Sequence, residues 1–191
     1  MNIHPQLVRG AAEAARIART ITPEHLSAPT PCPEFDARTL INHWVLYTSH
    51  GLEHRALRTT LPEELTEHDF TADPEWAEAY AAQLDRALAA WARPEAWEGG
   101  MDMGGAEMPA ADIAAMLLLE LVLHGWDVAK TVGQEFRADD ETGAVVLAAV
   151  EQQAEMFRQY KGFAEPVVLT GPATDLERAL ALSGRDPQWS A

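Results

Sequence analysis

Cysteine is almost absent from the sequence, and basic residues are few. Cys32 is the single cysteine among 191 residues, so the chain cannot form an internal disulfide. There are 14 lysines and arginines against 30 aspartates and glutamates, which gives a formal net charge of -16. Such a negative surface repels phosphate backbones and anionic lipid headgroups. We therefore expect no binding to nucleic acid or to membranes.

Long apolar runs are also missing. The most apolar stretch, residues 113–128, is interrupted by charged and polar side chains and is too short to span a bilayer comfortably. The residues after Met1 do not form a basic start followed by an apolar run, so we expect no signal peptide. Together these features predict a cytoplasmic protein.

Residues that favour helix are abundant, above all alanine, leucine and glutamate. Apolar residues recur at steps of three or four in several segments, and no long alternating pattern typical of strands occurs. Five helices are predicted, at about residues 5–21, 37–59, 74–92, 109–131 and 140–160. Prolines at alternate positions from Pro29 to Pro33 exclude helix between the first two.

Weaker patterns fill the remaining segments. Residues 93–108 contain several glycines and are typical of a long connection, with room for a short extended piece. Thr174 and Glu177 form a capping box for a short helix that Gly184 would end. We predict an all-α fold with a single domain over residues 1–191, a four-helix bundle with additional short helices and a long connection.

The fourth predicted helix carries a carboxylate and an imidazole on its buried side. Glu120 and His124 are four residues apart, so they share a face that is otherwise apolar. Burying an unpaired carboxylate costs several kcal/mol or forces it to take up a proton. A bound cation would be a partner for both side chains and would remove this cost. The alternative is a hydrogen-bonded pair in a plain bundle that holds no metal.

The second predicted helix can supply a third ligand. His43, His50 and His54 are expected along one side of it, and Tyr47 falls on its apolar side. At 1.5 Å per residue, His43 and His50 are about 10 Å apart along the axis, so they cannot share an ion without distortion. Periodicity does not decide which of the two meets the Glu–His pair. We take His50 and Tyr47 as candidates for a substrate pocket.

Four segments carry a resemblance to a known family. They are Thr30–Phe35 (TPCPEF), Leu40–His43 (LINH), Glu120–Asp127 (ELVLHGWD) and Gly184–Trp189 (GRDPQW), spread in this order over nearly the whole chain. The sequence resembles the DinB-like metal-binding family that is related to the N-terminal domain of mycothiol-dependent maleylpyruvate isomerase. The Glu-x-x-x-His-Gly-Trp-Asp run is the most specific part of the resemblance.

This resemblance implies a DinB-like four-helix bundle that holds one divalent ion, usually zinc or nickel. Carried over by position, the ligands are His43, Glu120 and His124, which settles the choice that periodicity leaves open. Asp127 is a candidate for orienting a ligand imidazole, and a purely local hydrogen bond near the helix end is the equal alternative. Cys32 has no basic neighbour in sequence that would activate its thiol, so we expect a buried free cysteine.

Three protein ligands leave a coordination position open, as in catalytic zinc sites. The resemblance implies a low-molecular-weight thiol of the mycothiol type as a partner, together with a small electrophile. We therefore expect a metal-dependent thiol transferase or isomerase. From the length of the sequence we expect no second domain of the kind that the isomerase has, and therefore no maleylpyruvate isomerisation itself.

Other interpretations of the same pattern stay open. One is a metal-binding bundle without turnover, acting in stress response or as a dimeric scaffold. Because relatives in the family pair as dimers, the resemblance also suggests a homodimer. Another is oxygen chemistry at non-haem iron, which two histidines and one carboxylate also describe.

Overall fold

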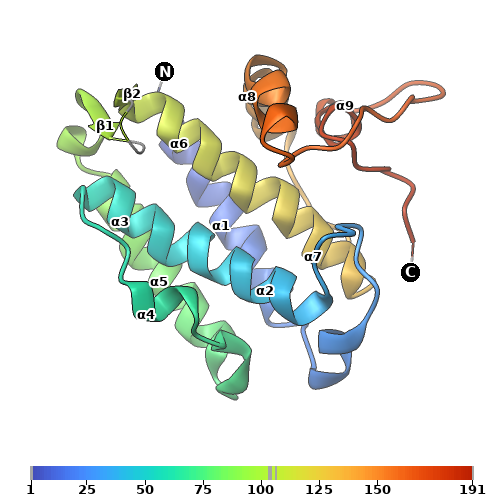
Figure 1. The fold of residues 1–191 in the computed structure, drawn as a ribbon, viewed down its shortest axis with the longest axis horizontal. Helices are drawn as coiled ribbons and strands as arrows, with labels where there is room; N and C mark the ends of the chain where they lie inside the picture. Colours follow the sequence, from blue (N-terminus) through green and yellow to red (C-terminus); the bar gives the residue numbers. More distant parts are fainter. Residues whose placement is uncertain (1, 103–104, 106, 191) are drawn as a thin grey trace.

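Four helical rods form a bundle, as the sequence predicts (Figure 1). The computed structural model describes residues 2–102, 105 and 107–190. Two rods are single helices, α1 (His4–Ala18) and α5 (Trp76–Trp91). The other two are composite: one comprises α2 (Ala37–Val45), η2 (Leu46–Gly51) and α3 (Leu52–Leu57), and the other comprises α6 (Ala110–Leu119), η5 (Glu120–His124) and α7 (Gly125–Thr131). The prediction of an all-α bundle is confirmed.

Each composite rod contains a π-helical turn, η2 or η5, where the sequence predicts uninterrupted α-helix. A local cause is visible in η2. The hydroxyls of Thr48 and Ser49 donate to the carbonyls of Trp44 and Val45, each at 2.6 Å. Hydroxyl bonds to the carbonyl four residues back compete with the backbone N–H groups and distort helices. Single π turns inside α-helices are frequent at functional sites.

The two composite rods lie side by side and run in opposite directions, so that α2 contacts α7 and α3 contacts α6 (Figure 1). Trp44 joins them in the core, because its indole Nε1 donates to the carbonyl of Leu121 at 3.3 Å. Its ring also packs on Tyr80 of α5, with centroids 5.0 Å apart. The Tyr80 and Thr48 hydroxyls are 2.6 Å apart and hydrogen-bonded. These buried contacts hold α2 and η2 in place against both neighbours.

Two further helices follow the bundle. α8 (Asp140–Gln159) packs against α1 and α6, and α9 (Asp175–Leu182) packs against α8. The predicted capping box between Thr174 and Glu177 is present at the start of α9. Gly184 follows this helix with a φ of 89°, a conformation that favours glycine.

The long connection over residues 93–108 contains a short antiparallel strand pair. β1 (Gly100–Asp102) pairs with β2 (Glu107–Pro109) after the short helical piece η4 (Pro94–Trp97). Other short helical pieces are η1 (Pro23–Ser27), α4 (Glu63–Thr66) and η3 (Phe70–Ala72). Among the helices of the described residues, none has the length and hydropathy needed to cross a bilayer.

Gly125 gives a test of the packing at the start of α7. A Cβ at this position would lie 2.5 Å from Cε2 of the buried Phe136. Overpacking of this kind costs about 1–3 kcal/mol, which exceeds the gain of about 1 kcal/mol from alanine's helix propensity. We expect Gly125→Ala to lower the midpoint of urea unfolding.

The double variant Gly125→Ala/Phe136→Leu is the control for this prediction, because the smaller side chain makes room for the added methyl group. Adding Gly125→Ala to Phe136→Leu should lower the midpoint of urea unfolding by less than adding Gly125→Ala to the parent protein does. Equal midpoints for Gly125→Ala and the parent protein would contradict the close contact.

Candidate metal centre

The structure brings together the imidazoles of His43 and His124 and the carboxylate of Glu120. Glu120 Oε2 lies 3.3 Å from His43 Nε2 and 3.6 Å from His124 Nε2. The three ligand atoms all lie within 4.8 Å of one another. Two side chains from the α6–α7 rod and one from the α2–α3 rod therefore point at a common centre between the rods.

The π turn η5 helps to align the pair on the α6–α7 rod, since Glu120 begins it and His124 ends it. In a regular α-helix, a step of four residues overshoots one full turn by about 40°. A π turn contains more residues than an α turn, so the same step comes closer to one full turn. The prediction that the two side chains share a face is confirmed, on a different type of turn from the one expected.

The spacing of the donor atoms fits a divalent cation. Zinc–nitrogen and zinc–oxygen bonds of about 2.0–2.2 Å in a tetrahedron place neighbouring donor atoms about 3.3–3.6 Å apart. The two contacts of Glu120, at 3.3 Å and 3.6 Å, match this separation. Two neutral imidazoles and one carboxylate suit zinc, nickel or iron, whereas calcium and magnesium prefer oxygen donors. The three side chains can therefore hold a metal ion.

Asp127 contacts the back of the His124 ring. His124 Nδ1 lies 3.0 Å from Asp127 Oδ2. A proton shared with a carboxylate at Nδ1 leaves the lone pair of the imidazole on Nε2, the atom that faces Glu120. The Asp127 side chain is completely buried, with 0% exposure. A bond that is local in sequence thus also orients the ring toward the candidate centre.

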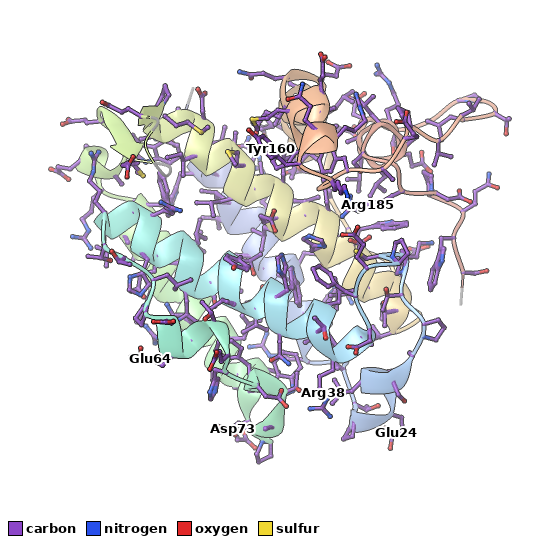
Figure 2. The ribbon with its side chains drawn as sticks, in the orientation of Figure 1. Glu24, Arg38, Glu64, Asp73, Tyr160 and Arg185 are labelled. Carbon is purple, nitrogen blue, oxygen red and sulfur yellow. The ribbon has the colours of Figure 1, made fainter. Side chains whose placement is uncertain are left out.

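Arg185 is a site residue that sequence reasoning missed. It lies after α9, beside the α6–α7 rod (Figure 2). Its Nε donates to Asp127 Oδ1 at 2.9 Å, and its Nη2 donates to Oδ2 at 2.8 Å. The family-like run at residues 184–189 contains Arg185, but no spacing rule connects it to a carboxylate 58 positions earlier.

The buried charges stabilise one another. Burial by itself would raise the pKa of the Asp127 carboxyl, but the positive charge of Arg185 and the hydrogen bond to His124 hold that pKa below its usual value. Burial would likewise raise the pKa of Glu120, and contacts with His43 and His124 lower it overall. Both carboxyl groups are therefore anionic at neutral pH, as a cation site requires.

Phe35 packs against both imidazoles. Its ring centroid lies 5.1 Å from that of His43 and 6.3 Å from that of His124. The Thr30 hydroxyl bonds the carbonyls of Cys32 and Phe35, at 2.6 Å and 2.9 Å, and so folds the proline-rich connection back toward the site. Phe35 belongs to the family-like run at residues 30–35, but no spacing rule predicts that its ring lies at the site.

Cys32 is half-buried. Burial and the negative charge of Asp127 raise the pKa of its thiol. A raised thiol pKa means little thiolate at neutral pH, so the geometry does not favour a nucleophilic role for Cys32.

A cavity of about 790 Å³ opens beside His43 and Glu120. Tyr47 lines it and packs its ring against His43, with centroids 4.6 Å apart. His50, the other residue expected in a pocket, does not line this cavity. Its ring stacks on Phe70 at 5.5 Å, because position 50 is turned toward η3. The expectation that the histidines of this helix share one side therefore fails at His50, within the π turn η2.

Comparison with known families decides the relationship. The family described as the mycothiol maleylpyruvate isomerase N-terminal domain matches residues 7–129, more than half of the chain. The chain belongs to this family. The resemblance to DinB-like proteins is thereby confirmed, and the matched segment contains His43, Glu120, His124 and Asp127. No curated protein and no solved structure matches the chain.

Metal content tests the candidate centre directly. We expect His43→Ala and His124→Ala to lower the affinity for zinc or nickel by at least about 100-fold, because losing a ligand costs more than losing an outer partner, which costs about 10–100-fold. Equilibrium dialysis with elemental analysis measures this. His50→Ala is the matched control, since it removes an imidazole from the same rod outside the cluster. Equal metal binding by the parent protein and His124→Ala would remove His124 from the site.

The Arg185–Asp127 contact predicts a stability effect. Arg185→Met leaves a fully buried carboxylate without its counter-charge, and breaking a buried pair from one side costs about 3–5 kcal/mol. Urea unfolding of the metal-free protein measures the loss. The double variant Asp127→Asn/Arg185→Met removes both charges and should be more stable than Arg185→Met alone. If the single and double variants unfold alike, the buried charge is not the cause.

Proposed function

We propose that the protein binds one zinc or nickel ion through His43, Glu120 and His124 and catalyses a thiol-dependent transfer or isomerisation. The observation that supports this most strongly is the position of the cluster at the wall of a cavity of about 790 Å³. Structural zinc sites are closed by four protein ligands, whereas catalytic sites have three and keep one position open. A cluster of three beside a cavity therefore favours chemistry over a structural role.

The proposed substrates are a low-molecular-weight thiol of the mycothiol type and a small electrophile. A bound divalent ion supplies stabilisation of the thiolate form of a thiol, which makes it a nucleophile near neutral pH. In transfer, the sulfur bonds to an electrophilic carbon, a leaving group departs with the bonding electrons, and the thiol proton passes to solvent. In isomerisation, the thiol adds reversibly to a double bond and is eliminated after rotation.

The residues of the chain have separate parts in this proposal. Asp127 and Arg185 hold the His124 ring in one orientation, and Phe35 packs against both imidazoles. Tyr47 packs beside His43 and lines the cavity, so it limits rotation of that ring and contacts a ligand placed there. Sites preorganised by packed neighbours and outer hydrogen bonds lose little free energy in ordering their ligands.

Thiol consumption by the metal-loaded protein tests this function. Lowering a thiol pKa from about 8.5 to about 7 raises the thiolate fraction at pH 7 from about 3% to about 50%. We therefore expect zinc- or nickel-loaded protein to consume N-acetylcysteine with 1-chloro-2,4-dinitrobenzene at least about tenfold faster than metal-free protein. His124→Ala should lose this acceleration, and His50→Ala should retain it.

Thiol binding measured in parallel distinguishes a thiol-dependent enzyme from a metal-binding bundle without turnover. Binding of the thiol to the metal-loaded protein without product from a panel of electrophiles would favour the metal-binding bundle without turnover. Absence of both binding and turnover would reject the proposed function.

A further inference from the structure

The cavity beside the metal cluster continues along one composite rod to a basic end. His43, Tyr47, Gly51 and Arg55 all line it, at successive steps of four residues. In a regular α-helix such a series drifts by about 40° at each step and leaves the cavity wall. The π turn η2 spans the middle of the series and reduces the drift, because it holds more residues per turn. The same rod therefore supplies both ends of the cavity.

The far end of the cavity carries two guanidinium groups. Arg58 lies where α3 ends, in a left-handed conformation with a φ of 56°. Its guanidinium donates to the backbone carbonyls of Glu95, Glu98 and Gly100, which pins it against η4 and β1. Backbone carbonyls carry no net charge, so these bonds fix the position of Arg58 and leave its positive charge in place.

Arg55 is half-buried at the cavity wall, and within the described residues its side chain has no hydrogen bond or ion pair. Asp102 also lines the cavity, but its carboxylate accepts from the backbone N–H of Gly105. Neither Arg55 nor Arg58 has a carboxylate partner within the described residues. The backbone N–H leaves the negative charge of Asp102 in place, so two guanidinium groups face one carboxylate among the residues that line this end.

The walls between the two ends are mostly apolar, with Leu61, Met101, Ile113, Met116 and Leu117 along them. Twelve residues separate His43 from Arg55, which corresponds to about 18 Å along the axis. Side chains of both residues lean toward the helix N-terminus, and arginine is the longer, so the two functional groups are closer together than this axial distance. The space suits an elongated ligand with an apolar or neutral middle.

We propose that Arg55, supported by Arg58, binds a carboxylate at the end of the cavity remote from the metal cluster. The planar guanidinium matches a carboxylate in a two-pronged hydrogen bond. The inference rests on the proposed function and makes it more specific, because it states a functional group that one of the two substrates carries. Either the thiol or the electrophile carries a carboxylate roughly 10–15 Å from the reacting atom.

Two matched thiols test the assignment. 8-Mercaptooctanoate and its primary amide have the same length and the same sulfur, and they differ in charge at the far end. Cobalt-loaded protein reports sulfur binding through its thiolate charge-transfer absorption, which requires no turnover. We expect the acid to bind at least about tenfold more tightly than the amide. Arg55→Gln should abolish this preference and leave the affinity for the amide unchanged.

Arg93→Gln is the matched control, because it removes the same charge from an exposed position that does not line the cavity. It should keep the preference for the acid. Arg55→Lys keeps the charge without the two-pronged geometry and should retain part of the preference. Equal preference in the parent and in Arg55→Gln would overturn the inference.

A second arm asks which substrate carries the carboxylate. Octanoate is titrated into cobalt-loaded protein that is saturated with 2-mercaptoethanol. One outcome is that octanoate binding depends on Arg55, while 8-mercaptooctanoate and its amide bind equally well. This outcome supports the inference and assigns the carboxylate to the electrophile. Absence of Arg55-dependent binding in both arms overturns it. Failure of every thiol to produce the charge-transfer band would instead reject the proposed function, which is a distinguishable result.

Discussion

A carboxylate with no contact to solvent is the constraint on which the candidate site depends. Asp127 lies inside the core and can remain ionised there because Arg185 and His124 surround it. Such a buried network adds little net stability compared with an apolar core, since desolvation offsets most of the attraction. Its contribution is to geometry: the network allows one orientation of the His124 ring, and that orientation directs Nε2 at Glu120.

The rest of the site follows from the way two antiparallel rods meet. Trp44 joins the rods one position from His43 and bonds the carbonyl of Leu121, one position from Glu120. The core contact and the candidate metal centre therefore share the same two helical turns. A shift of either rod along the other would break a buried hydrogen bond as well as the cluster. Helices packed in this way hold ligand atoms more rigidly than loops do.

Much of this arrangement is predictable from the sequence, and the remainder is not for identifiable reasons. Apolar periodicity predicts α5 at residues 74–92 and α8 at residues 140–160, and the structure has them at Trp76–Trp91 and Asp140–Gln159. Periodicity works here because each helix buries one continuous face. It does not detect a π turn, because one extra residue in a single turn shifts the apolar pattern by only one position. For this reason His50 stacks on Phe70 and does not line the cavity, although periodicity predicts it on the same side as His43.

Some residues of the candidate site are likewise predictable from the sequence, and others are not. Spacing of four residues pairs Glu120 with His124, but the choice of His43 over His50 needs the family resemblance, since both lie on one predicted helix. Arg185 lies in the family-like run at residues 184–189, but neither spacing nor the resemblance assigns it a role. Its partner lies 58 positions away, and contacts of that kind depend on how α8 and α9 return to the bundle.

The position of Arg185 also shows that the segment matched by the family model differs from the set of residues that build the site. Similarity to the family ends at residue 129, two positions after Asp127. The hydrogen-bonding requirement of Asp127 is met from outside that interval, by a residue that follows α9. A unit that ended at residue 129 would contain the buried carboxylate of Asp127 without Arg185, its positively charged partner. For this chain, the contacts that build the site extend beyond the segment that the family model matches, and Arg185, which follows α9, belongs to the site.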